Sequence, residues 1–308
     1  RIERAIALRD TLDLGDTNAL RWVHGEGDRC PGVVVDRYAD VAVVRLDGPA
    51  IEAHADAIVR AVASAGERRG VTSITVRDTT RGERSSVVAH GAPPPDEIVV
   101  REHGIPFVVD LAKGQKTGAF LDQRDNRRRV GEWSRGRRVL NLFSYAGGFS
   151  LHAALGGAAR CTSVDVAAAA HVTAQRSFRE AGVDPTAHEF VTADVFGFLD
   201  RAATRGDRWD LVVCDPPNMA PSEATRQRAM TAYRRLHKAC ARVLANDGVL
   251  CAASCSSHVT PDDFLSTLDD DSLGRDDLRV VTIAGAGADH PVVAGFPEGR
   301  YLKFIVLR

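Results

Sequence analysis

Short apolar runs alternate with longer amphipathic segments through the second half of the chain. The runs are rich in Val, Leu, Ile and Cys, which is typical of buried strands. We expect strands at residues 139–143, 161–164, 189–192, 211–214, 249–253, 280–283 and 301–307. Helical spacing separates the earlier runs, at residues 150–155, 167–181, 195–205 and 223–244. This alternation predicts an α/β fold with a parallel, doubly wound sheet.

The last two of these strands are joined differently from the others. Residues 285–299 between them are rich in glycine and proline and show no helical pattern. We therefore expect the final pair to be antiparallel, because antiparallel strands need no crossover helix. A seven-stranded Rossmann-like sheet with a reversed last strand is the plan of class I methyltransferases, and not of dinucleotide dehydrogenases.

The first part of the chain mixes its patterns without this regular alternation. Helical spacing occurs at residues 4–14 and 51–65, and a hairpin pattern at residues 22–47. Further strand patterns follow at residues 74–77, 87–89, 98–101 and 105–110. We expect a smaller N-terminal α+β domain over residues 1–110 and the methyltransferase-like domain over residues 111–308.

Composition bounds the compartment and the partners. The chain has 308 residues, 44% of them hydrophobic and 26% charged, which suits two domains with real cores. The net charge of −1 gives no global basic field, so any contact with nucleic acid has to come from local patches. The six cysteines lack metal-ligand spacing, which favours free thiols in a reducing cytoplasm and no metal site. No apolar run approaches the roughly twenty residues that span a bilayer, so no membrane association is expected.

Acidic residues at successive strand ends predict a cofactor site. The strand before them runs into a glycine turn at residues 141–149, where the backbone can approach a ligand closely. Its spacing is not G-x-G-x-x-G, so a dinucleotide pyrophosphate is not indicated. Asp165, Asp194 and Asp215 end the next three strands, where carboxylates can bind ribose hydroxyls and an adenine amino group. This set predicts S-adenosylmethionine; the alternative for Asp165 and Asp194 is capping of the helices that follow.

A second pair of strand ends carries candidate chemistry. Asp215 opens the turn Asp215-Pro216-Pro217-Asn218, and Cys255 lies between two serines after the neighbouring strand. Carbon 5 of a pyrimidine becomes nucleophilic only after a nucleophile such as a thiolate adds to carbon 6, and the carboxylate can orient the base. Two alternatives stay open. The turn can instead grip an exocyclic amine without any cysteine, and Cys255 can be a small buried residue like the other five cysteines.

The same segments resemble the bacterial 23S rRNA large-subunit cytosine-5 methyltransferase family. The segments that carry the resemblance are GQKTGAFLDQRDNR (114–127), NLFSYAGGF (141–149), DPP (215–217), SCS (254–256), ADHPV (288–292) and PEGRYLK (297–303), with residues 25–28, 31–38 and 102–104 in the first domain. Two departures stand out. The family usually begins with an RNA-binding PUA domain, and this chain is expected to start just after it. The family also tends to have lysine where this chain has Asn218, which loosens the assignment of the target base.

The resemblance implies roles for individual residues. Cys255 would be the nucleophile and Asp215 the acid that orients the base. Residues expected to bind the cofactor are Lys116, Phe120, Asp122, Gln123, Phe143, Ser144, Tyr145, Gly147, Asp165, Val166, Asp194, Val195 and Asp215. Residues expected to bind the substrate are Pro216, Pro217, Asn218 and Arg124.

The expected partner is RNA, as 23S rRNA or a precursor of the large ribosomal subunit. Arginine-rich stretches at residues 124–129, 135–138 and 226–238 would contact phosphate, although each can also be an ordinary solvated helix face. Other readings stay open: N-methylation of guanine or adenine, a small-molecule methyltransferase, or an RNA-binding protein without turnover. The oligomeric state is also left open, with a homodimer as one option.

Overall fold

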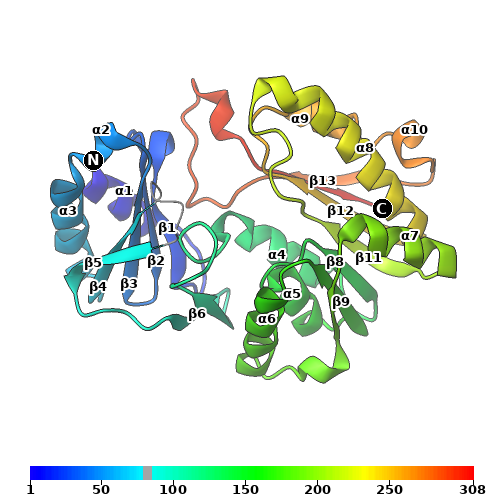
Figure 1. Ribbon diagram of the computed structural model, residues 1–308, viewed down its shortest axis with the longest axis horizontal. Helices are drawn as coiled ribbons and strands as arrows, with labels where there is room; N and C mark the ends of the chain where they lie inside the picture. The colour runs from blue at the N-terminus through cyan, green and yellow to red at the C-terminus, as the bar shows by residue number, and fades with distance from the viewer. Residues whose placement is uncertain (79–84) are drawn as a thin grey trace. The chain divides into compact units, whose positions relative to one another are not determined.

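The computed structural model describes residues 1–78 and 85–308, which form two compact units (Figure 1). The first unit comprises Arg1–Arg124 and Gly287–Gly299, and the second comprises Asp125–Ala286 and Arg300–Arg308. The domain boundary near residue 110 is a prediction from the sequence; the first compact unit runs on to Arg124 and also takes in a segment from near the end of the chain.

The first unit is an α+β structure built on a five-stranded sheet of order β1-β2-β3-β4-β5. Its strands are β1 (Ala19–His24), β2 (Val33–Tyr38), β3 (Val41–Leu46), β4 (Ser73–Asp78) and β5 (Ser85–Gly91). Neighbouring strands are antiparallel except β3 and β4, which are parallel and joined through the helices α2 (Pro49–Glu52) and α3 (Ala55–Glu67). The expected hairpin at residues 22–47 is confirmed and extended to three strands.

Both faces of this sheet are covered, because its central strands are apolar on both sides. Ala42 and Val44 of β3 pack with α1 (Ile2–Arg9) and α3, while Val41 and Val43 pack toward Val100. Val100 belongs to the hairpin of β6 (Glu97–Glu102) and β7 (Ile105–Asp110). Helix α1 ends at Arg9, earlier than the expected residue 14, since Asp10, Thr11 and Asp13 have low helix propensity.

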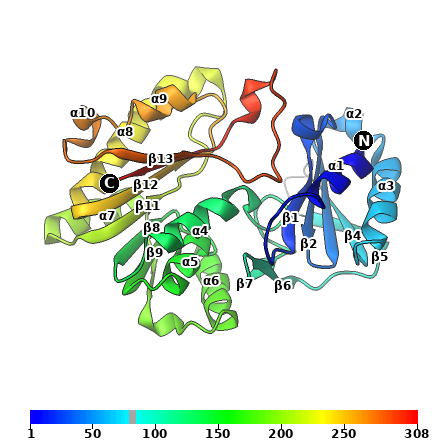
Figure 2. The ribbon, with the colours of Figure 1, turned by 180° about the vertical axis from the view of Figure 1, so that it is seen from behind.

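The second unit contains a seven-stranded sheet of order β10-β9-β8-β11-β12-β14-β13 (Figure 2). Its strands are β8 (Arg138–Leu142), β9 (Arg160–Asp165), β10 (Glu189–Thr192), β11 (Trp209–Cys214), β12 (Leu244–Ser254), β13 (Val280–Ala284) and β14 (Lys303–Leu307). The first five are parallel, and β14 runs antiparallel to both β12 and β13. The expected α/β class, the strands and the reversed ending are therefore confirmed.

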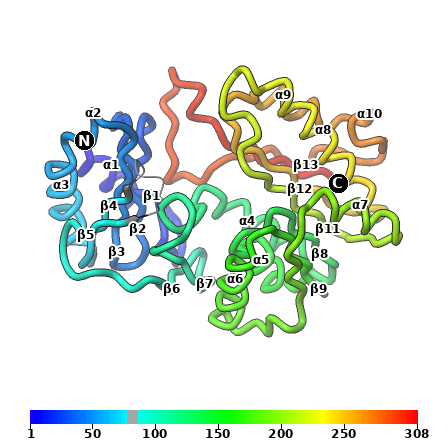
Figure 3. Tube along the Cα trace, viewed as in Figure 1, coloured from blue at the N-terminus to red at the C-terminus, as the bar shows by residue number. Residues whose placement is uncertain are grey.

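Helices cover both faces of the second sheet, as the chain trace also shows (Figure 3). The helices are α4 (Arg124–Glu132), α5 (Gly148–Leu155), α6 (Ala168–Glu180), α7 (Val195–Arg205), α8 (Arg226–Val243), α9 (Pro261–Leu265) and α10 (Asp270–Leu273). Strand β11 shows the alternation: Val212 and Cys214 pack in the core that contains α7 and α8, whereas Leu211 and Val213 pack in the core that contains α4 and α5. A strand with two buried faces has to be apolar at every position, which is why these strands read as continuous apolar runs.

Candidate active site

The carboxyl ends of five parallel strands meet at one edge of the second sheet. The register pairs Leu142 of β8 with Val164 of β9 and with Cys214 of β11, and pairs Cys214 with Ala252 of β12. The residues that follow these positions include Phe143, Asp165 and Asp215, so the sheet brings these predicted site residues to a common edge. In open α/β sheets this edge is where ligands bind.

The glycine turn after β8 is strained and depends on its sequence. Phe143, Tyr145 and Gly147 all have positive φ, at 57°, 45° and 73°. Aromatic residues rarely adopt this region, and such strain gathers at binding sites. A Cβ at Gly147 would lie 2.8 Å from the Cβ of Ala174, so glycine is needed both for conformation and for space.

Asp165 holds this turn in place. One carboxylate oxygen accepts a hydrogen bond from the Tyr145 N–H and the other from the Ala167 N–H, each at 2.8 Å. A carboxylate offers about four lone-pair sites, so two hydrogen bonds leave capacity for a ligand hydroxyl. Val166, the next residue, is 69% exposed and offers an apolar surface for a flat ring. These features fit the adenosine part of S-adenosylmethionine, and the assignment of these residues stays a prediction.

Helix α5 adds a place for an anionic group. Gly147 is its N-terminal flanking residue, and no side chain caps its first turn. Backbone N–H groups at a helix start attract carboxylates. Behind the turn, Ser144 lies 3.4 Å from the Nε2 atom of His171, and burial lowers the pKa of that histidine, which favours its neutral form. The start of α5 therefore fits the methionyl carboxylate, and this contact stays a prediction.

Asp194 differs from Asp165. It is exposed and caps helix α7, because its carboxylate accepts a hydrogen bond from the Gly197 N–H at 2.8 Å. The capping alternative considered from the sequence thus describes Asp194, while a contact with adenine stays a prediction. Val195 is buried in the core, and Phe196 carries the guanidinium of Arg235 4.7 Å above its ring.

At the same edge of the sheet, the loops that follow β11 and β12 are joined by hydrogen bonds between neutral groups. The Ser256 hydroxyl donates to the Asn218 amide oxygen at 2.9 Å and accepts from the Met219 N–H at 3.1 Å. The Tyr233 hydroxyl of α8 lies 2.9 Å from the Ser254 hydroxyl and 3.0 Å from that of Ser256. The structure thus joins the Asp-Pro-Pro-Asn turn to the loop that carries Cys255.

Cys255 stands apart from the other cysteines by its exposure. It is half-buried in the loop after β12, whereas the five others are buried. Burial raises the pKa of Cys161 and Cys251 to about 12, which makes them inert thiols. Pro217 and Asn218 are exposed beside it, and Pro216 is buried. A solvent-reachable thiol next to the acidic turn is what a nucleophile for a flat base requires.

Sequence reasoning missed the residues that hold these loops. Tyr233 lies within the arginine-rich stretch 226–238, and Lys303 is the last residue of the segment 297–303 that carries the family resemblance, but the sequence predicts no role for either. Strand register reveals Lys303, because it pairs with Ser254 across β14 and β12. The available signal is a lysine directly before the apolar run of residues 304–307.

The predicted cofactor residues of the 114–124 segment belong to the first unit. Lys116 has a positive φ of 53°, donates to the Asp122 carboxylate at 3.1 Å and lies 4.5 Å from the centre of the Phe120 ring. Asp122 and Gln123 are buried. Their contact with the cofactor stays a prediction.

Arg124 needs a correction. Its side chain is fully buried, and its two terminal nitrogens donate to both carboxylate oxygens of Asp289 at 2.9 and 3.0 Å. Asp289 also accepts from the Arg21 N–H at 2.9 Å. This pair gives Arg124 a structural role in the first unit, and we remove it from the residues expected to bind RNA. His237, in the basic stretch 226–238, is likewise buried.

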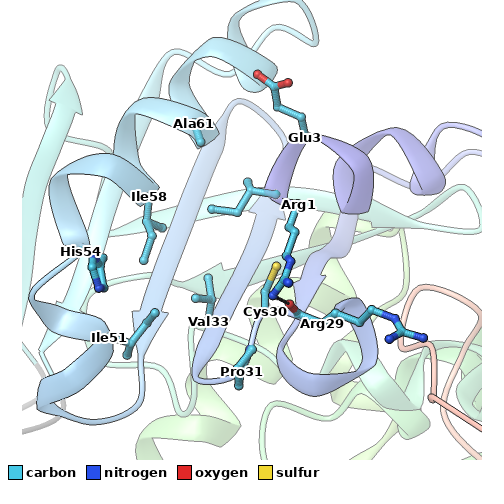
Figure 4. A pocket seen from close by; sticks show the side chains of 11 residues that line it. Arg1, Glu3, Arg29, Cys30, Pro31, Val33, Ile51, His54, Ile58 and Ala61 are labelled. Atoms are coloured by element: carbon cyan, nitrogen blue, oxygen red, sulfur yellow. Dashed lines mark hydrogen bonds between the residues drawn. The ribbon is translucent and has the colours of Figure 1, made fainter.

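A hollow of about 460 Å³ lies elsewhere, within the first unit (Figure 4). Its walls are mostly apolar and include Cys30, Val33, Ile51 and Ile58. None of the predicted site residues lines it, so we do not place the active site there. Among the described residues, no cluster of three or more potential metal ligands is found. Within residues 1–78 and 85–308, none of the helices combines the length and apolar character needed to cross a bilayer.

Comparison with known proteins agrees with this geometry. Two solved structures superpose on nearly the whole chain: a methyltransferase complexed with SAH (TM-score 0.87, 25% identity, 99% of this chain and 80% of that one) and a SAM-dependent methyltransferase from Streptococcus mutans (TM-score 0.88, 25% identity, with the same coverage). The chain is 39% identical to a ribosomal RNA large subunit methyltransferase of Deinococcus radiodurans, covering 100% of this chain and 78% of that protein. It is 36% identical to ribosomal RNA large subunit methyltransferase I of Alteromonas mediterranea, covering 99% and 78%. The family model of S-adenosylmethionine-dependent methyltransferases matches residues 56–284, and this chain belongs to that family.

Proposed function

We propose that this methyltransferase methylates carbon 5 of a cytosine in large-subunit ribosomal RNA through a covalent adduct on Cys255. The observation that carries the proposal is the half-buried Cys255 in a loop bonded to the Asp-Pro-Pro-Asn turn. The names of the relatives, which are ribosomal RNA large subunit methyltransferases, support the substrate. The six cysteines are free thiols, in keeping with a reducing cytoplasm.

The reaction divides between the two loops. The Cys255 thiolate adds to carbon 6 of the cytosine, and the electron pair of the broken 5,6 double bond makes carbon 5 nucleophilic. S-adenosylmethionine, when bound, would supply the electrophilic methyl group to carbon 5, with S-adenosylhomocysteine as the leaving group. A base then removes the carbon 5 proton, and the returning electron pair expels the Cys255 thiolate. Asp215 holds the ring during these steps by accepting from the exocyclic amine.

The hydrogen bonds of Asn218 fit a structural role in the turn better than direct binding of the base. Its amide oxygen already accepts hydrogen bonds from the Ser256 hydroxyl at 2.9 Å and the Ala220 N–H at 3.0 Å. Asn218 therefore stabilises the turn, and its amide NH₂ group is the part that remains for a substrate contact. This weakens the alternative of amino-group methylation without excluding it from the test.

RNA containing 5-fluorocytidine tests the proposal, because the carbon 5 fluorine cannot be removed as a proton. The wild-type protein with S-adenosylmethionine should form a species that survives denaturing electrophoresis. Cys255→Ala should form none and lose turnover while still binding the cofactor. Asp215→Ala should bind cofactor normally and form the adduct poorly.

Cys30→Ala is the matched control, since it removes a thiol of the first unit and should leave the adduct unchanged. Full turnover in Cys255→Ala would overturn the carbon 5 assignment and favour N-methylation. Nucleoside mass spectrometry of the methylated 23S rRNA would then identify the modified atom.

A further inference from the structure

Lys303 buries an ammonium group beside the active-site loop. The side chain is 4% exposed, at the start of β14. Its Nζ atom donates hydrogen bonds to the carbonyl oxygens of Ser256 at 2.6 Å and of Tyr301 at 2.7 Å. Removing an ammonium from water is costly unless it is paired and hydrogen-bonded, so its surroundings have to stabilise the charge. The two carbonyl oxygens stabilise part of the charge, and the ammonium has a third N–H that can donate to another acceptor.

The strand register places this charge under the loop that carries Cys255. Lys303 pairs with Ser254 across the antiparallel strands β14 and β12, and its Nζ atom reaches the Ser256 carbonyl. The two residues that flank Cys255 are therefore the ones that Lys303 meets, one through the strand and one through its side chain. In Figure 1, β14 is the red strand that leads to the C-terminus.

Acidic groups near Lys303 come from two elements. They are Asp263 of α9 and Cys255 itself, whose negative charges oppose the effect of burial on the lysine. Asp263 is already bound to the Arg226 guanidinium through both oxygens, at 2.6 and 2.7 Å. The Cys255 thiol is the remaining acidic neighbour that can balance the ammonium. Burial lowers the pKa of Lys303 to about 8, so the amine is largely protonated at neutral pH.

Three other titratable groups come from the elements around the Cys255 loop. Tyr233 of α8 has its pKa raised to about 12 by burial and stays neutral. Asp215 follows β11, and His258 follows the cysteine loop, where it lies 3.7 Å from the Glu223 carboxylate. Negative carboxylates near Cys255 disfavour its thiolate. The attraction between the Lys303 ammonium and the thiolate therefore has to exceed the repulsion from these carboxylates.

We propose that Lys303 is a positioning residue that holds the Cys255 loop through the Ser256 carbonyl and stabilises the Cys255 thiolate with its ammonium charge. This role rests on the proposed function only in that the proposed reaction uses the Cys255 thiolate as its nucleophile. The charge pairing itself can be measured without RNA. Cysteines beside lysine are known to ionise below the usual value near 8.5, and the thiolate is the reactive form.

The test is the pH dependence of alkylation of Cys255 by iodoacetamide, followed by mass spectrometry of the peptide that contains Cys255. Lys303→Met should move the midpoint upward by about one pH unit or more and slow alkylation at pH 7 about tenfold. Lys303→Arg keeps the charge and should keep the midpoint near that of the wild type. Lys303→Gln keeps a hydrogen-bond donor without charge and should behave as Lys303→Met does.

Tyr233→Phe is the matched control, because it removes two hydrogen bonds from the same loop without changing its charge. Its midpoint should stay at the wild-type value, provided that cofactor binding and thermal unfolding show a folded protein. A Lys303→Met or Lys303→Gln midpoint equal to that of the wild type would overturn the proposal. A wild-type midpoint at or above about 8.5 would do so without any variant.

The outcome separates this inference from the proposed function. Should the wild-type protein form no adduct with 5-fluorocytidine RNA while the alkylation midpoint still responds to Lys303, the reaction assignment is wrong and the charge pairing stands. Should the adduct form while the alkylation midpoint is the same with and without Lys303, the reaction assignment stands and the charge pairing is wrong.

Discussion

The two compact units stabilise their buried polar groups in opposite ways. The first unit pairs charge with charge, in the buried ion pairs Arg9–Asp28, Arg21–Asp36 and Arg124–Asp289. The active-site loops of the second unit are held by neutral hydroxyl and amide groups around Ser254 and Ser256, with Lys303 as a buried cation among them.

The partners of each charged group indicate whether it can still bind a ligand. Asp28, Asp36 and Asp289 each have their charge balanced by a guanidinium. Each also accepts at least one further hydrogen bond, from the His24 N–H, the Thr117 hydroxyl and the Arg21 N–H respectively, so the charged motifs of the first unit act as structure. Asp165 in the second unit accepts two hydrogen bonds from backbone N–H groups, and it keeps lone pairs for a ligand. A charge near a site is therefore informative only after its partner is known.

Breaking the Arg124–Asp289 pair is expected to have the largest effect. Asp289→Ala leaves a buried guanidinium beside His290 with its main partner removed, which should lower the free energy of unfolding by about 3–5 kcal/mol. Urea unfolding followed by tryptophan fluorescence measures this, with Trp22, buried in the first unit, as the reporter left after Trp133 and Trp209 are replaced by Phe. Asp207→Ala, which breaks the more exposed pair Arg205–Asp207, should cost less than about 1 kcal/mol. Equal losses would remove the distinction between the units.

The second unit should be sensitive to acid at His237. Burial lowers the pKa of this histidine to about 4, below the value near 6.5 of an unfolded chain. The neutral form stabilises the fold fully above pH 6.5, and this contribution is lost as the pH falls toward 4. The loss should reach about 3 kcal/mol.

Replacing His237 by Gln tests this titration. Unfolding free energies measured between pH 6.5 and 4 should fall less steeply in His237→Gln than in the wild type, even though the variant loses packing against Phe264. A slope equal to that of the wild type would show that His237 is not the group responsible.

Replacing the two strand-end carboxylates should have different effects, on cofactor binding for Asp165 and on stability for Asp194. Asp165→Ala should weaken S-adenosylmethionine binding by about 2 kcal/mol in calorimetry, because a charge-assisted hydrogen bond and the support of the Tyr145 turn are both lost. Asp194→Ala should lower stability by about 1 kcal/mol through the lost helix cap. Unchanged affinity in a folded Asp165→Ala protein would take Asp165 out of the site.

Surface arginines should show the smallest effect, on the salt dependence of RNA binding. Arg234 is exposed, and Arg234→Gln should reduce the slope of log affinity against log salt by about 0.7–0.9. Arg226 is already bound to Asp263, so Arg226→Gln should change the slope less. A flat salt response in the wild-type protein would point instead to a small-molecule substrate.

Much of the second unit follows from local patterns. The strand segments, the glycine turn at Gly147 and the reversed last strand were all predicted, because buried strands have continuous apolar runs that end at polar turns. Helix α1 was expected to be longer, since end positions depend on weak propensities. The role of Arg124 was misjudged, because its partner Asp289 is 165 residues away and no local pattern shows such a pair.

Periodicity and short motifs along the chain were enough to assign the class of fold, the family and the residues at the carboxyl ends of the strands. The roles of the polar residues depend on long-range contacts in the folded chain. The tertiary structure made Asp194 a helix cap, turned Arg124 into half of a buried ion pair and placed Lys303 under the loop of Cys255. The physical reason is that the energy of a charge is set by its partners and its exposure to water, and both come from segments far apart along the chain.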